Sequence, residues 1–142
     1  MVGELRRGEW TTEYFDDRFE RFFLSLAGYQ QAVLMAAVEF FLEVYGPDIC
    51  AGEWGKPLGG GLYEFRVSKS LAAILSAADV EREPNPGDDR KVLIRLFCTF
   101  HGDKVVLIYH GYDKGRDPSS KRQQREIARA RTAHSRWKRT QP

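Results

Sequence analysis

Three segments that alternate polar and apolar residues constrain the fold of this chain most. They cover residues 62–67, 91–98 and 104–112, and each has the two-residue period of a half-buried β-strand. Three glycines precede the first segment, and His101–Asp103 predicts a tight turn between the other two. The sequence therefore predicts a small antiparallel sheet with one buried and one open face.

The alternation also assigns residues to faces. Arg66 and Arg95 fall on the open face, opposite the apolar residues that we expect to lie against helices. On the third segment, every second position is occupied by Val106, Ile108, His110 and Tyr112. A strict two-residue period thus predicts that all four lie on one face.

The N-terminal third reads as one short strand and two helices. Residues 9–14 are β-prone, and residues 15–26 carry aromatic side chains at helical spacing. Residues 29–45 are apolar nearly all round, so we expect this helix to be buried against the sheet. Gly46-Pro47 predicts its end.

An insertion and a basic helix complete the predicted order. Residues 68–90 separate the first two sheet segments and contain a possible short helix at 70–75 and a Pro/Gly-rich loop that we expect to be mobile. Residues 117–139 read as a basic helix with Asp117 as N-cap. Its apolar stripe is narrow, so we expect it to dock weakly.

The length of 142 residues fits one domain spanning residues 1–142, and no apolar run approaches the ~20 residues of a membrane span. The N-terminus lacks the apolar core of a signal peptide. Cys50 and Cys98 form neither a zinc motif nor a disulfide framework. These features predict a cytoplasmic protein without a structural metal or a membrane association.

The charges are unevenly distributed, although the net charge is only +2. The first 53 residues carry 4 Lys/Arg against 10 Asp/Glu, whereas residues 114–142 carry 10 against 2. A basic third that follows an acidic third predicts one face that attracts a polyanion. The alternative interpretation is a solvated basic helix without a partner.

Two arginines are the first candidate site residues. Arg66 and Arg95 share the open face of neighbouring predicted strands, and guanidinium offers a planar, bidentate fork to phosphate. Such cations can stabilise the charge that develops on a phosphodiester during cleavage. The structural alternative is an ion pair between Arg66 and a carboxylate such as Glu64.

Three further residues complete the predicted catalytic set. His110 titrates nearest to neutral pH and is the first candidate for acid or base, and Tyr112 could position or stack on a nucleotide. Lys114 could hold the phosphate or, with its pKa lowered by neighbouring arginines, act as the base. A purely structural role for His110 stays open.

Basic residues outside this set predict contacts to RNA. They are Lys56, Lys91, Lys121, Arg122 and Arg125. His101 and His134 read as turn and helix-surface residues with little functional weight. No His/Cys/Asp cluster has metal-ligand spacing, so we predict neither a metal nor another cofactor.

Four short motifs occur in a specific order along the chain, at residues 60–66 (GGLYEFR), 94–95 (IR), 106–114 (VLIYHGYDK) and 127–130 (IARA). In this order the chain resembles the HigB-like toxins of phage-derived type in the RelE/ParE superfamily. The resemblance covers about residues 10–137. It departs from the family in the 68–90 insertion and in having Lys114-Gly115 where relatives commonly have two lysines.

The resemblance implies an α+β, RelE-like domain: a small antiparallel sheet, two N-terminal helices on one face and a C-terminal basic helix. It also implies the toxin of a type II toxin–antitoxin system. Such toxins are metal-independent mRNA interferases that often act in the ribosomal A site. The implied partners are mRNA, the ribosome and a small helix-turn-helix antitoxin from the adjacent gene.

Two other functions fit the residues. One is a non-catalytic module that binds RNA or the ribosome, and the other is a protein-interaction domain whose basic helix contacts an acidic partner. Loss of cleavage without loss of RNA affinity in arginine variants would separate the nuclease from the first alternative.

Overall fold

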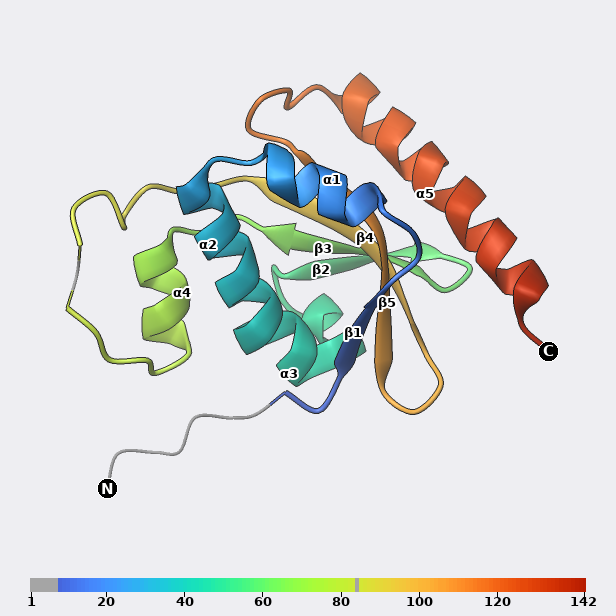
Figure 1. Cartoon of the computed structure of the whole chain (residues 1–142), viewed down its shortest axis with the longest axis horizontal. Coiled ribbons are helices and arrows are strands. Elements are labelled where there is room, and N and C mark those ends of the chain that lie inside the picture. The colour runs from blue at the N-terminus through green and yellow to red at the C-terminus, as the bar shows by residue number, and fades with distance from the viewer. Residues whose placement is uncertain (1–7, 84) are drawn as a thin grey trace.

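The protein is described here by a computed structural model that covers residues 8–83 and 85–142. Its centre is a five-stranded sheet in the order β1-β5-β4-β3-β2 (Figure 1). The strands are β1 (Thr11–Tyr14), β2 (Gly55–Gly59), β3 (Leu62–Val67), β4 (Ile94–His101) and β5 (Val105–Asp113). Helices cover the sheet, so the predicted α+β class is confirmed.

The sheet is mixed, which corrects the expectation of a purely antiparallel sheet. Strands β2 to β5 pair antiparallel, but β1 runs parallel to β5, with Thr11 opposite Val105 and Tyr14 opposite Ile108. Alternation within a segment predicts a strand and its faces but not the direction of a distant partner. β1 and β5 are joined through most of the chain, so no hairpin fixes their orientation.

The N-terminal helices cover one face of the sheet. They are α1 (Arg18–Ser25) and α2 (Gly28–Ala37), and α2 continues through a π-helical turn (Val38–Leu42) into α3 (Glu43–Tyr45) and a 3₁₀ segment (Gly46–Ala51). The predicted helices at 15–26 and 29–45 correspond to these elements. Gly46 ends the run with φ of +54°, and a Cβ there would lie 2.3 Å from the Trp10 ring. Glycine is therefore required at this turn.

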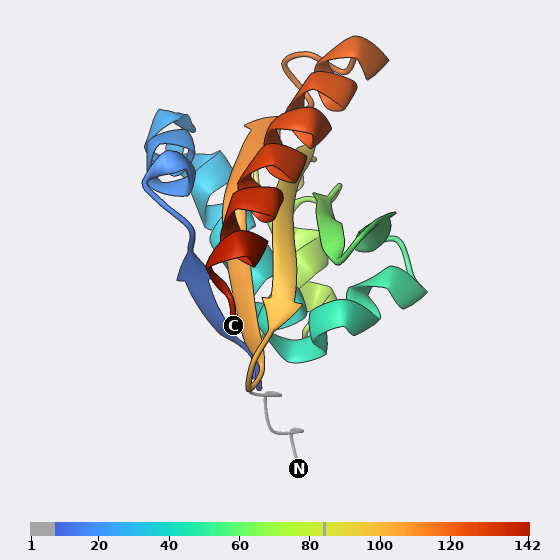
Figure 2. The same cartoon turned by 90° about the vertical axis from the view of Figure 1, so that its right-hand side faces the viewer.

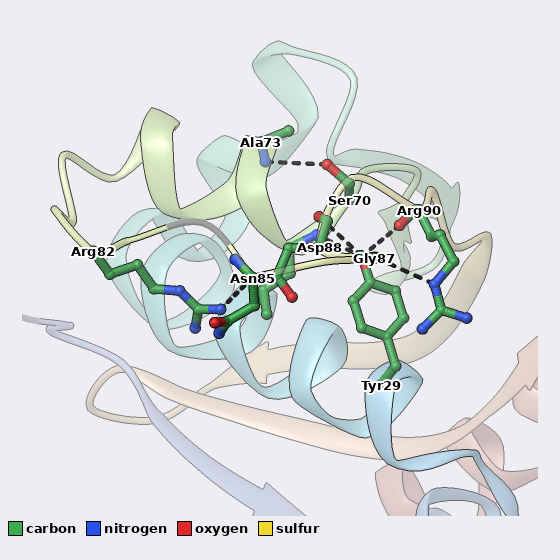
Figure 3. Close-up of polar contacts among 9 residues, drawn as sticks. Tyr29, Ser70, Ala73, Arg82, Asn85, Gly87, Asp88 and Arg90 are labelled. Carbon is green, nitrogen blue, oxygen red and sulfur yellow. Dashed lines mark hydrogen bonds and ion pairs between the residues drawn. The ribbon is translucent and has the colours of Figure 1, made fainter.

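The 68–90 insertion packs beside α2, away from the C-terminal helix (Figure 1). It contains α4 (Leu71–Ala77), whose N-cap Ser70 accepts a hydrogen bond from Ala73 N at 3.1 Å. The Tyr29 hydroxyl of α2 ties the insertion down: it accepts from Leu71 N and lies 2.6 Å from the Arg90 carbonyl (Figure 3). The insertion is thus anchored to the helical face.

The C-terminal helix α5 (Ser120–Thr140) crosses the other face of the sheet, over β4 and β5 (Figure 2). Its N-cap is Ser119, whose hydroxyl accepts from Arg122 N at 3.2 Å, and not Asp117 as the sequence predicted. Asp117 lies two residues outside the cap and accepts from Ser119 N instead. The face that the sequence predicted to be open is therefore covered.

A β-bulge in β5 overturns part of the predicted face assignment. Phe97 pairs with His110 but Cys98 pairs with Ile108, so Tyr109 is an extra residue between the two pairs. The alternation reverses there, and His110 and Tyr112 lie on the α5 face instead of beside Ile108. The expected shared face with Val106 and Ile108 is wrong because a period of two assumes an unbroken register.

The glycine run forms the tip of the β2–β3 hairpin. Gly59, Gly60 and Gly61 have φ of +93°, +67° and +87°, a backbone region that other residues avoid. The predicted sharp turn before β3 is confirmed, whereas no strand was predicted at the position of β2. Among the described residues, no helix is long and apolar enough to cross a membrane.

Candidate functional site

Strand register gathers the two predicted arginines and Tyr112 on the α5 face. Arg66 pairs with Arg95, and Arg95 pairs with Tyr112, so their side chains lie in one row across β3, β4 and β5. Lys114 follows directly after β5. These four predicted site residues therefore meet at one end of the sheet, and we call them, together with Glu64, the arginine cluster.

Glu64 is the centre of the arginine cluster. Its carboxylate is fully buried; Oε1 accepts from Arg66 Nε at 2.7 Å and lies 4.0 Å from Arg95 Nε. Its second oxygen accepts from Gln123 of α5 at 3.2 Å. The structural alternative for Arg66 is thus present, and one carboxylate is shared between two guanidinium groups.

Arg95 is buried to 7% exposure at the back of the cluster. Nη1 donates to Ser68 Oγ and to the Ile94 carbonyl, both at 3.2 Å. Burial lowers the pKa of Arg95 from its usual value, Glu64 raises it, and Arg66 lowers it further. A guanidinium keeps its proton in any case, so Arg95 is a fixed positive charge in a region of low dielectric.

Lys114 stands at the partly exposed rim of the cluster. Partial burial lowers its pKa, and the positive charges of Arg95 and Arg66 lower it further, against an opposing effect of Glu64. This is the direction of shift expected for a lysine beside arginines. Lys114 is therefore closer to the neutral, proton-accepting form than an isolated lysine.

His110 belongs to a second group that joins β5 to α5. Its Nε2 lies 3.4 Å from Glu126 Oε2, without hydrogen-bond geometry, and both side chains are 3% exposed. Arg129 and Arg122 contact Oε1 of Glu126 at 3.2 and 3.6 Å. Burial alone would raise the pKa of Glu126, but His110 and Arg129 outweigh it and hold this pKa below its usual value.

Several buried polar atoms under α5 form no hydrogen bond within the described part of the chain, although three of them lie within ion-pair distance of Glu64 or Glu126. They are Arg95 Nε, both ring nitrogens of His110, the Tyr112 hydroxyl and Arg122 Nε. Tyr112 is 1% exposed, and its ring lies between Phe97, 6.2 Å away, and Arg122, 5.4 Å away. A buried polar atom without a hydrogen bond costs stability, so we expect water or a bound polar group to contact those that have no ion-pair partner.

The predicted RNA-binding residues divide into three locations. Lys56 is exposed on β2 and pairs with Glu64, so it borders the arginine cluster. Lys121 and Arg125 are exposed on α5, whereas Arg122 turns inward toward Glu126. Lys91 lies on the α2 side, where it lines a cavity with Tyr29 and Arg90, and is not brought to the cluster.

The sequence interpretation missed the part of α5 that fixes the helix to the sheet. His134 is 4% exposed; its Nδ1 lies 2.6 Å from the Tyr109 hydroxyl and its Nε2 lies 2.8 Å from the Gly60 carbonyl. Arg131 adds bonds to the carbonyls of Leu58 and Gly59. His134 is not a surface residue, and this anchoring contradicts the expectation of weak docking.

A helical signal for these residues was present. Glu126, Ala130, His134 and Trp137 recur at intervals of three and four, which is the spacing of a single helix face. His134 was predicted to lie on the helix surface, and Glu126 was not singled out. Their position on the stripe carried the information.

Within the described residues, no group of three or more His, Cys, Asp or Glu side chains is arranged to hold a metal ion. Comparisons with protein families, curated proteins and solved structures found no match for this chain. The function is therefore argued from the site itself.

Proposed function

We propose that this chain is a metal-independent endoribonuclease with a RelE-like arrangement, the toxin of a type II toxin–antitoxin pair that cuts mRNA on the ribosome. The observation that carries the proposal is the arginine cluster. Three adjacent strands bring two arginines and a lysine of lowered pKa to one end of the sheet. This combination suits a phosphodiester and a proton acceptor next to it.

In the proposed reaction the 2′-oxygen of a ribose attacks the adjacent phosphorus. The O2′–P bond forms, the P–O5′ bond breaks, and a 2′,3′-cyclic phosphate and a 5′-hydroxyl result. Neutral Lys114 accepts the 2′-hydroxyl proton, and Arg66, whose side chain is 31% exposed, contacts the phosphate oxygens. Arg95 adds positive charge from the buried side as the phosphorane gains charge.

The proton for the 5′-oxygen has two candidate donors in the site. Tyr112 pairs with Arg95, and His110 lies two residues earlier on β5, under α5. Burial raises the pKa of Tyr112, with a further increase from Glu64, so its hydroxyl keeps a proton. Tyr112→Phe and His110→Gln, which preserve size, separate the two roles by the loss of cleavage in one variant and not in the other.

The first experiment is primer extension on a defined mRNA in a translating extract. Arg66→Ala should lose cleavage by orders of magnitude while the fold persists. Arg21→Ala is the matched control, because Arg21 is an exposed arginine of α1 on the other face of the sheet. Equal cleavage by both variants, or no cleavage by the wild type, would contradict the nuclease proposal.

A pH–rate profile tests the role of Lys114. If the neutral amine accepts the proton, single-turnover cleavage should rise with pH until Lys114 is largely deprotonated. Lys114→Arg keeps the positive charge but cannot accept a proton at these pH values, so this rising limb should disappear. An unchanged profile in Lys114→Arg would assign the base elsewhere.

A non-catalytic RNA- or ribosome-binding module is the second candidate. It is favoured by the burial of Arg95, His110 and Tyr112 beneath α5 and by the ion pair that neutralises Arg66. Such a module would lose only affinity in Arg66→Ala, with a shallower dependence of binding on salt. For the toxin, we also propose a helix-turn-helix antitoxin as partner, which co-purification with the product of an adjacent gene would test.

A further inference from the structure

The outward side of α5 carries a stripe of cations that the arginine cluster does not use. At 3.6 residues per turn, five exposed side chains fall within about 80° of arc along a helix of about 30 Å. They are Lys121, Arg125, Arg129, Arg136 and Arg139. We call this set the α5 cation stripe.

The α5 cation stripe has almost no negative charge of its own. The one acid of α5 is Glu126, which is buried against His110 on the inner side. Within the described residues, the side chains of Lys121, Arg125 and Arg136 form no hydrogen bond or ion pair. The stripe is therefore available to an external anion over most of the helix.

Helix stability explains only Arg139 of the stripe, which lies in the last turn of α5, where the helix dipole favours cations. Lys121 and Arg125 lie near the N-terminus of α5, where the helix dipole favours acids, and the first turn contains none. Lys121, Arg125 and Arg129 are spaced four apart, so neighbouring cations repel each other along the stripe. The cations destabilise an isolated helix, which indicates that a ligand supplies the opposing charge.

The residues between the cations indicate which ligand fits. Small side chains separate the cations on the same outward side: Ala128, Thr132 and Ser135 are all exposed there. A broad ligand can therefore approach the helix surface closely. The aromatic residue of α5, Trp137, instead packs toward His101 and His134. Single-stranded nucleic acids are usually held by stacking on aromatic side chains, and protein interfaces by aromatic or apolar anchors. The stripe offers neither.

We propose that the α5 cation stripe docks on the phosphate backbone of double-stranded RNA. Guanidinium groups on a rigid, straight helix match regularly spaced phosphates and read backbone shape without reading bases. The choice of RNA over DNA rests on the proposed function, whereas the preference for a duplex over a single strand rests on the lack of an aromatic side chain on the stripe. Helix α5 lies on the outside of the sheet (Figure 2), and the side chains of the stripe are exposed, so docking leaves the arginine cluster to act on a separate, single-stranded segment.

The test is fluorescence anisotropy with a labelled RNA duplex over a series of salt concentrations. A triple variant, Arg125→Gln/Arg136→Gln/Arg139→Gln, should bind at least tenfold more weakly, and the slope of log affinity against log salt should fall by about 2–3. The control removes three ion-paired cations from other parts of the chain: Arg21→Gln/Lys69→Gln/Lys104→Gln. It should keep the wild-type slope.

Three results would overturn the proposal: equal losses in both triple variants, tighter binding to a single strand than to the duplex, or equal binding to polyglutamate. Equal binding to duplex DNA would overturn the choice of RNA. The triple variant should unfold at the wild-type temperature or above it, which excludes misfolding as the cause.

Cleavage of single-stranded RNA is measured in parallel. If the wild type binds the duplex but cleaves no RNA, the nuclease proposal is refuted and the docking proposal is supported. If the wild type cleaves RNA but does not bind the duplex in preference to a single strand, only the docking proposal is refuted.

Discussion

The two faces of the sheet are covered in different ways. On the α1–α2 face, large apolar side chains close the interior, and Phe65, Leu96 and Ile108 are fully buried there. On the α5 face, the helix contributes small residues, Ala130 and Ala133, over Phe97 and Tyr109. Charged and titratable side chains share that second interface.

The difference separates the apolar core from the predicted site residues. Apolar burial stabilises a fold at about 25 cal/mol per Å², whereas buried ion pairs contribute little net stability after desolvation. Glu64, Arg95, His110 and Glu126 are all buried on the α5 face. We infer that the α1–α2 face holds the domain together and that the α5 face keeps polar groups for a ligand.

The largest expected effect on stability comes from the apolar face. Phe65→Ala should lower the free energy of unfolding by about 3–5 kcal/mol, because it removes a fully buried ring that stacks near Trp54. Denaturant unfolding measures this loss. Leu24→Ala is the control, since Leu24 is 66% exposed. A loss below about 1 kcal/mol in Phe65→Ala would contradict the assignment of this face as the core.

The carboxylate of the arginine cluster should affect stability and binding in opposite directions. Glu64→Gln leaves Arg66 and Arg95 without their shared negative charge and should cost about 2–3 kcal/mol, less than a fully buried pair, because Arg66 is 31% exposed. The same change should increase affinity for single-stranded RNA, since both guanidinium groups become available. Unfolding and anisotropy titrations measure the two effects, and weaker RNA binding would argue against a phosphate site.

His134, which holds α5 on the sheet through Tyr109 and Gly60, should make the stability of the protein depend on pH. Burial lowers the pKa of His134, and Lys138 and Arg131 lower it further, against a rise from the bond to the Gly60 carbonyl. The folded-state pKa of His134 lies below the unfolded value of about 6.5. The contribution of His134 to the free energy of unfolding is therefore present above pH 6.5 and is lost as the pH falls through the folded-state pKa. The unfolding free energy should therefore decrease from neutral pH into this acidic range.

A matched variant isolates this effect. His134→Gln can still accept from Tyr109 and donate to Gly60 but does not titrate, so the decline below pH 6.5 should become shallower. The expected difference is about 1 kcal/mol, the size of one net hydrogen bond. An identical pH dependence in both proteins would assign the decline to other groups.

The smallest effect should come from an exposed ion pair on the apolar side. Arg21 lies 3.3 Å from Asp17 at the surface of α1, with both side chains 70% exposed. Arg21→Ala should change the unfolding free energy by less than about 0.5 kcal/mol. A larger loss would mean that surface charge, and not burial, distinguishes the two faces.

Much of the architecture followed from local patterns. The strand segments, the two N-terminal helices, the hairpin glycines and the basic helix were all predicted from periodicity and turn residues, because each depends on neighbours within a few positions. β2 was missed because Gly55–Gly59 has no alternation of its own and pairs only through β3. The parallel pairing of β1 depends on a partner about 90 residues away.

The candidate site was predicted in part for the same reason. Arg66 and Arg95 lie on regular strand positions, so register could bring them together once their strands were recognised. The positions of His110 and Tyr112 depended on the bulge at Tyr109, and the burial of Arg95, His110 and Tyr112 depended on where α5 docks. Glu126 and His134 became visible as partners only through that docking.

The sequence by itself determined the elements, the uneven charge and the identity of the cations, since these depend on composition and local period. The tertiary structure decided that α5 covers the predicted open face, that one carboxylate is shared by two arginines, and that five cations remain outside. The physical reason is that burial and ion pairing are properties of residues brought together from distant parts of the chain, and no local pattern encodes them.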